Sequence, residues 1–202
     1  MINRKLDNYI EQHFKNSRSA LMLTGTRQTG KTFAIRKYAQ SKGLNLIEIN
    51  FYEDNAAYRI FEGAQTAKDV LMRISAHTHK STSANNTLIF FDEVQQCPQA
   101  VTWVKFLADE GSCQYALSGS LLGVELKDIA SVPVGYMALK EVFPLDFEEF
   151  VRALGISNEV LSAVQQCMRE AKPVDDVIHQ SLLKALHLYL ITGGMPAVVQ
   201  TY

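Results

Sequence analysis

Two hydrophobic periodicities alternate along this chain of 202 residues. Short apolar runs, typical of strands buried on both faces, alternate with stretches in which apolar residues recur every three or four positions, typical of helices. Strands are predicted at 20–24, 44–51, 87–91, 115–120 and 136–143. Helices are predicted at 2–15, 33–42, 56–61, 66–77, 95–107, 147–154, 157–170 and 173–191. The elements within residues 20–51 form a βαβ unit, which predicts an α/β fold with parallel strands.

The segment between the first predicted strand and its following helix spells Gly-Thr-Arg-Gln-Thr-Gly-Lys-Thr. This is the G-x-x-x-x-G-K-T pattern of a phosphate-binding P-loop, whose glycines let backbone N–H groups point at a polyphosphate. The lysine adds a positive charge, and the last threonine offers its hydroxyl to Mg²⁺. A glycine turn that binds nothing is the alternative, but the flanking strand and helix favour the P-loop. The predicted nucleotide-binding residues are Gly25, Thr26, Arg27, Gln28, Thr29, Gly30, Lys31, Thr32 and Phe33.

Two acidic residues, Asp92 and Glu93, follow the apolar run 87–91. A buried parallel strand delivers such residues to the carboxyl edge of the sheet, where ligands bind. Asp92 is predicted to hold Mg²⁺ together with Thr32, and Glu93 is predicted as the catalytic residue that orients or deprotonates the attacking water. The alternative is a strand whose polar end simply meets solvent, and the preceding P-loop makes the Mg²⁺ interpretation the stronger one.

The predicted strand 115–120 ends in small hydroxyl residues. In ATPases with an Asp-Glu pair like that at 92–93, a polar residue at this strand end commonly touches the γ-phosphate or the attacking water. By this similarity, Ser118 and Ser120 are predicted as further catalytic residues with a sensor role. The alternative is that either hydroxyl caps a turn.

Composition and charge limit the classes of function. The formal net charge is -1, which disfavours nucleic-acid binding by this chain alone, because proteins that grip a phosphodiester backbone are usually basic. No apolar stretch is as long as a membrane span and no signal-peptide core follows Met1, so a cytoplasmic protein without a membrane partner is predicted. The three cysteines lack metal-ligand spacing and are expected to be reduced. Because the composition changes after Gly155, residues 1–155 are predicted to form the P-loop NTPase domain and residues 156–202 a separate helical segment.

Five motifs occur in order along nearly the whole chain. They are the loop 25–32, Asp-Glu-Val-Gln at 92–95, Ser-Gly-Ser at 118–120, Phe-Pro-Leu-Asp-Phe-Glu-Glu-Phe at 143–150 and Gly-Gly-Met-Pro at 193–196. In these motifs the chain resembles a group of bacterial and archaeal AAA-like ATPases whose P-loop reads G-x-R-Q-x-G-K-T. The resemblance implies a three-layer αβα sandwich of the additional-strand type, in which the strand 115–120 lies between the P-loop strand and the strand 87–91.

The resemblance carries three further expectations. The nucleotide is expected to be ATP. A C-terminal domain normally follows the ATPase part, so this chain is expected to be truncated. The family also usually has Arg or Lys at the position of Tyr136; if that cation stabilises the transferring phosphate, efficient hydrolysis is in question.

The leading hypothesis is Mg²⁺-dependent hydrolysis of ATP to ADP and phosphate, coupled to a conformational change of the C-terminal helices or domain. The alternative is a switch, occupied by ATP or ADP, that controls a protein or nucleic-acid partner with little hydrolysis. Tyr136 and the expected lack of the C-terminal domain favour the switch, and Glu93 opposes it. A phosphotransferase acting on a small substrate is the weaker third hypothesis, because Glu93 would activate water instead. The partner and the oligomeric state stay open. Arg152 or Arg169 are candidate arginine fingers if the chain oligomerises, but the stronger interpretation of either is a solvated surface residue.

Overall fold

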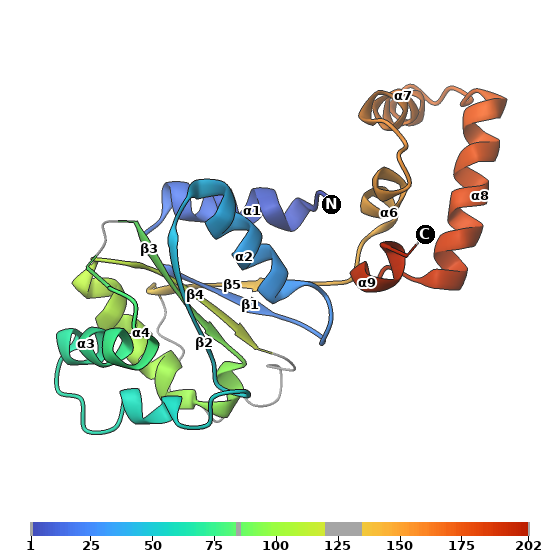
Figure 1. The fold of residues 1–202 in the computed structure, drawn as a ribbon. Helices are drawn as coiled ribbons and strands as arrows, with labels where there is room; N and C mark the ends of the chain where they lie inside the picture. The colour runs from blue at the N-terminus through green and yellow to red at the C-terminus, as the bar shows by residue number, and fades with distance from the viewer. Residues whose placement is uncertain (1, 84–85, 120–134, 202) are drawn as a thin grey trace. The chain divides into compact units, whose positions relative to one another are not determined.

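The computed structural model describes residues 2–83, 86–119 and 135–201 (Figure 1). The chain forms two compact units. One unit is Leu6–Val142, called the nucleotide unit below, and the other combines Met1–Lys5 with Phe143–Tyr202, called the C-terminal unit. Within the described ranges, no helix is both long enough and apolar enough to cross a membrane.

The nucleotide unit is built on a sheet of five parallel strands in the order β2-β3-β4-β1-β5. The strands are β1 (Ala20–Thr24), β2 (Asn45–Asn50), β3 (Thr87–Asp92), β4 (Gln114–Gly119) and β5 (Met137–Glu141). Because β4 lies between β1 and β3, the additional-strand order implied by the family resemblance is confirmed. All five carboxyl ends meet at one edge, which is where ligands bind in α/β sheets of this kind.

Helices cover both faces of this sheet, as predicted. Side chains alternate along each strand, so that Ala20 and Met22 point to one face while Leu21 and Leu23 point to the other. The first face packs against α3 (Ala67–Thr78) and α4 (Pro98–Glu110), and the second against α1 (Lys5–Asn16) and α2 (Lys31–Lys42), as Figure 1 shows. The result is a three-layer αβα sandwich with a core on each side of the sheet.

The helix ends follow local chemistry. Gly43 ends α2 in the left-handed conformation (φ +62°), and its N–H bonds to the last turn of that helix. Pro98 begins α4, where its missing N–H costs nothing. The predicted helix 56–61 is shorter and tighter than expected, a 3₁₀ turn, η1 (Ala57–Ile60). The segment 95–107 was predicted as a helix or as a turn followed by a helix, and it has the second form: the 3₁₀ turn η2 (Val94–Gln96) followed by α4.

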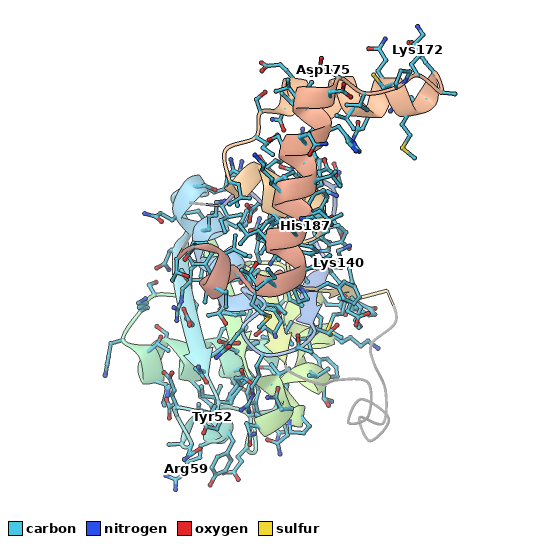
Figure 2. The ribbon with its side chains drawn as sticks, turned by 90° about the vertical axis from the view of Figure 1, so that its right-hand side faces the viewer. Tyr52, Arg59, Lys140, Lys172, Asp175 and His187 are labelled. Carbon is cyan, nitrogen blue, oxygen red and sulfur yellow. The ribbon has the colours of Figure 1, made fainter. Side chains whose placement is uncertain are left out.

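Four helices make up the C-terminal unit. They are α6 (Phe147–Ala153), α7 (Asn158–Arg169), α8 (Asp176–Thr192) and α9 (Pro196–Val199). The capping box predicted at Asp146 and Glu149 begins α6, and Asp175 caps α8 with hydrogen bonds from two backbone N–H groups. Figure 2 shows Asp175 at the start of α8, next to the turn that carries Lys172, and His187 further along the helix. The sequence analysis did not predict α9.

Two of the motifs noted in the sequence meet inside the C-terminal unit. The Leu145 N–H donates to the Gly194 carbonyl at 2.6 Å, and the Leu145 carbonyl accepts a hydrogen bond from the Tyr189 hydroxyl at 2.8 Å. A β-carbon at Gly194 would lie 2.1 Å from the Leu145 oxygen, so only glycine allows this approach. The segments 143–150 and 193–196 therefore stabilise one another.

The division into compact units falls between Val142 and Phe143, so that α6 belongs to the C-terminal unit. The domain boundary after Gly155 stays a prediction from the sequence. Residues near the start of the chain belong there too: the Lys5 N–H donates to the buried Glu149 carboxylate at 2.7 Å, and the Arg4 guanidinium donates to the Phe143 carbonyl at 2.8 Å.

Candidate functional site

The Gly25–Thr32 loop joins the carboxyl end of β1 to the start of α2. Three of its residues adopt positive φ: Gly25 (+133°), Gln28 (+64°) and Gly30 (+88°). A β-carbon on Gly25 would lie 2.2 Å from the Val142 carbonyl oxygen, which explains the glycine there. The buried Thr29 closes the turn, since its hydroxyl donates to the Thr26 carbonyl at 2.9 Å.

The start of α2 has the features of an anion-binding helix end. Gly30 is the N-cap and provides no side-chain hydrogen bond, and the first turn carries no acidic residue. The first N–H groups of a helix lack intrahelical partners, and the helix dipole adds partial positive charge there. Phe33, in this first turn, is 47% exposed, so its ring is largely in solvent while its backbone remains at the helix start.

Lys31 folds back onto the loop. Its Nζ donates to the carbonyl oxygens of Gly25 at 2.9 Å and Thr26 at 2.7 Å, and the side chain is 6% exposed. Burial lowers the pKa of Lys31, while the negative charges of Glu93 and Asp92 act in the opposite direction. Both carboxylates are therefore near enough to Lys31 to act on its charge.

Asp92 is at the carboxyl end of β3 and is 3% exposed. Its Oδ2 accepts a hydrogen bond from the Thr32 hydroxyl at 2.9 Å, and its Oδ1 accepts from the Glu93 N–H at 3.1 Å and from the Ser118 hydroxyl. The predicted pair of metal ligands, Thr32 and Asp92, is thus brought together across 60 positions of sequence. Donors from three elements fix the orientation of this carboxylate.

Glu93 follows Asp92 in the left-handed conformation, with φ +55°. This residue is the N-cap of η2, and the change of direction at Glu93 ends β3. Its Oε2 accepts a hydrogen bond from the side-chain amide of Gln95. Gln95 belongs to the motif at 92–95, but its role could not be predicted from the sequence. Its hydrogen bond to Glu93 depends on the tight 3₁₀ turn that brings positions 93 and 95 together.

Ser118 lies at the end of β4 and is 1% exposed. Its hydroxyl is directed at Asp92, so in this structure Ser118 orients a predicted metal ligand. The sensor role of Ser118 stays a prediction, and Ser120 lies outside the described residues. Arg152, a candidate arginine finger, forms an i,i+4 ion pair with Glu148 on α6, and Arg169 is an exposed residue at the end of α7.

Tyr136 lies at the edge of the sheet opposite the Gly25–Thr32 loop. It immediately precedes β5, and its carbonyl accepts a hydrogen bond from the Ala20 N–H, at the start of β1, at 2.9 Å. Gly25 lies five positions after Ala20 along the strand, a distance of about 16 Å. The Tyr136 ring lies 5.3 Å from the Lys105 Nζ. A side chain at this position is therefore too far away to stabilise a phosphate bound to its own loop.

The Thr32 and Asp92 oxygens fit a magnesium ion chemically. Mg²⁺ prefers hard oxygen ligands and is usually held by one or two protein side chains together with phosphate oxygens and water. Thr32 Oγ1 and Asp92 Oδ2, 2.9 Å apart, are such a pair at the carboxyl edge of the sheet. Among the described residues there is no cluster of three or more His, Cys, Asp or Glu side chains that could hold a metal without further ligands.

The chain is similar to several known proteins. The Walker-type ATPase PABY2304 of Pyrococcus abyssi has a similar fold, with a TM-score of 0.55 and 16% sequence identity, covering 98% of this chain and 66% of that one. The Pif1 helicase of Candida albicans matches with a TM-score of 0.47 and 14% identity over 87% of this chain and 49% of that one. An uncharacterised protein of Haemophilus influenzae is 24% identical over 168 residues, and this alignment spans 79% of the chain and 40% of that relative.

The model of one family, described as AAA domain, matches residues 17–151. This range contains the sheet, the Gly25–Thr32 loop and the carboxylates at its edge. The order of the strands and the position of the loop are those of nucleotide-binding P-loop ATPases. The chain therefore belongs to the AAA domain family.

Proposed function

We propose that the protein is an ATPase that binds Mg·ATP in the Gly25–Thr32 loop and hydrolyses it to ADP and phosphate. The observation that carries this proposal is the junction of the loop with the Asp92-Glu93 pair, where the Thr32 hydroxyl lies 2.9 Å from Asp92 Oδ2. We also propose the cytoplasmic location that is expected from the sequence. A reducing compartment agrees with the three free thiols, which are Cys97, Cys113 and Cys167.

Each residue has a role in the proposed reaction. Backbone N–H groups of the loop and of the first turn of α2 bind the phosphates, with residues 25–33 as the binding segment. Lys31 exchanges its bonds to the loop carbonyls for bonds to the β- and γ-phosphates. Thr32 and Asp92 would hold Mg²⁺, which would neutralise the negative charge that develops on the phosphates.

Glu93 activates the water in this mechanism. Its carboxylate accepts a proton as the water oxygen forms a bond to the γ-phosphorus and the bond from that phosphorus to the ADP oxygen breaks. Its place directly after the metal ligand Asp92, and its effect on the Lys31 charge, support an assignment beside the phosphates.

The second part of the proposal is coupling between hydrolysis and the C-terminal unit. Val142 supports it, because this residue links the loop to the segment that continues into that unit. The Val142 N–H donates to the Thr24 carbonyl at 2.7 Å, and the Val142 carbonyl fills the space where Gly25 has no side chain. A change in the loop on nucleotide binding therefore acts on the last residue of the nucleotide unit.

The alternative is an ATP- or ADP-occupied switch with little hydrolysis, which acts on a protein or, through a further C-terminal domain, on nucleic acid. Tyr136 is one of the two sequence features in favour of this switch. Because Tyr136 lies at the opposite edge of the sheet, its identity is no argument against hydrolysis within one chain. Arg152 and Arg169 remain the proposed arginine fingers if the protein forms oligomers.

The test is to measure phosphate release from Mg·ATP by the wild-type chain and by Glu93→Gln, and to titrate both with Mg·ATP in a calorimeter. We expect turnover by the wild type and its loss in the variant, with binding preserved, because glutamine keeps the shape but cannot accept the proton. Nucleotide binding without turnover by the wild type would support the switch, and unchanged turnover by the variant would remove Glu93 from the mechanism.

A further inference from the structure

We infer that Gln95 is a positioning residue for hydrolysis: its side-chain amide holds the Glu93 carboxylate in the orientation that accepts a proton from water. The Gln95 Nε2 group donates to Glu93 Oε2. This inference rests on the proposed ATPase function and adds to it a residue that was given no role there.

The backbone around Gln95 is well fixed. Gln95 lies in the middle of η2, whose turns are closed by hydrogen bonds from the Gln96 N–H to the Glu93 carbonyl and from the Cys97 N–H to the Val94 carbonyl, both at 3.0 Å. Val94 and Cys97 are 0% and 3% exposed and anchor the turn in the core of the sheet face that carries α3 and α4. The amide donor is therefore presented from a rigid element.

Glu93 needs such a partner because its side chain is flexible. A glutamate side chain has three torsion angles, and fixing it in one conformation costs conformational entropy. The hydrogen bond from the Gln95 amide fixes Glu93 Oε2, and we assign the other oxygen of this carboxylate as the proton acceptor.

A carboxamide suits this task chemically. The amide NH₂ donates to a carboxylate but does not ionise, so it neither neutralises the base nor competes with it for the proton. A lysine or arginine at this position would form an ion pair with Glu93 and weaken it as a proton acceptor. The geometry of a general base contributes strongly to its efficiency, because proton transfer requires the acceptor within hydrogen-bonding distance of the water.

The experiment compares Gln95→Leu with Gln96→Leu. Leucine is close to glutamine in size but has no donor, and the neighbouring Gln96 is an exposed residue of the same turn, which makes it a matched control. For Gln95→Leu we expect kcat for ATP hydrolysis to fall at least about tenfold, with KM and the Kd for Mg·ADP within about twofold of the wild-type values. Gln96→Leu is expected to behave as the wild type.

Two further variants separate positioning from a structural defect. Gln95→Glu keeps the size and polarity but places a like charge beside Glu93, so it is expected to lose kcat as Gln95→Leu does while still binding Mg·ADP. In the Glu93→Gln background, Gln95→Leu is expected to cause no further loss of the residual rate, because the two residues act as one unit.

The outcomes are distinguishable. Turnover by Gln95→Leu equal to or faster than the wild type overturns the positioning role and leaves the ATPase proposal standing. Loss of Mg·ADP affinity in both Gln95→Leu and Gln95→Glu also overturns the positioning role, because this loss would show that Gln95 has a structural role. A wild-type chain that binds Mg·ATP without turnover contradicts the ATPase proposal itself, and the positioning role with it.

Discussion

The Nζ atom of Lys31 lies 2.7 Å from the carbonyl oxygen of Thr26, inside the loop that we propose to bind phosphate. Lys31 thus donates hydrogen bonds to carbonyl oxygens of its own loop. These hydrogen bonds must be broken before Lys31 can bind a phosphate. Thr32 and Glu93 are likewise bonded to protein partners, Asp92 and Gln95. Nucleotide binding in this site is therefore an exchange of hydrogen bonds.

Replacing Lys31 by alanine should weaken Mg·ATP binding by about 10- to 100-fold, because hydrogen bonds to charged groups contribute about 1.5–3 kcal/mol. Calorimetric titration measures this loss directly. Lys42→Ala is the control, since Lys42 lies in the last turn of the same helix and pairs with Glu11. Wild-type affinity in Lys31→Ala would refute the assignment of the phosphate site.

Replacing Gly25 by alanine should destabilise the nucleotide unit by about 3 kcal/mol or more, because the new β-carbon meets the Val142 carbonyl in a backbone conformation with φ +133°. A thermal melt should show a fall in Tm of about 6–12 °C. In Gly43→Ala the φ of +62° is strained but no atom lies within 4 Å, so a smaller cost of about 1 kcal/mol is expected. Equal Tm changes in the two variants would argue against a close contact at Gly25.

Replacing Ser118 by alanine should weaken Mg²⁺ binding at the site without unfolding the protein. The hydroxyl orients Asp92, and loss of such an outer partner typically lowers metal affinity by about 10- to 100-fold. The measurement is the Mg²⁺ concentration that gives half-maximal ATP turnover, which should rise. Ser112→Ala, at an exposed position before β4, serves as the control and should leave this concentration unchanged.

Replacing Gly194 by alanine should disrupt the C-terminal unit, because a β-carbon there would lie 2.1 Å from the Leu145 carbonyl oxygen. Limited proteolysis should cleave residues 143–201 much faster in this variant than in the wild type. Gly155→Ala, with nothing within 4 Å of its new β-carbon, is the comparison in the same unit. If Gly194→Ala resists the protease as the wild type does, the contact between the two motifs is not needed for stability.

The sequence was sufficient to predict features whose signal is local. The strand 20–24 and the helix after the loop were predicted because an apolar run, a glycine pattern and a helical periodicity follow one another directly. The capping box at Asp146 and Glu149 was also confirmed, since its two partners are three residues apart. The αβα fold and the central position of β4 came from the family resemblance, and the strand order confirms them.

Features that depend on distant contacts could not be predicted. The residues around Tyr136 in the sequence do not indicate that it lies at the edge of the sheet opposite the loop. Its place follows from the parallel register of β5 with β1. The role inferred for Gln95 depends on the left-handed backbone of Glu93, which is unusual for a residue other than glycine. Similarly, the contact of Leu145 with Gly194 spans 49 positions and has no periodic signal.

The bond from the Lys5 N–H to the Glu149 carboxylate has a consequence for synthesis of the chain. Residues near the amino terminus leave the ribosome first, but their partners in the C-terminal unit follow only after the whole nucleotide unit has been made. The nucleotide unit can fold as soon as its last strand emerges, whereas the C-terminal unit must wait for both ends of the chain. A fragment that begins at Phe143 would lack Arg4 and Lys5, which contact the buried Glu149 carboxylate. A single cut of the chain therefore cannot separate the nucleotide unit from a complete C-terminal unit.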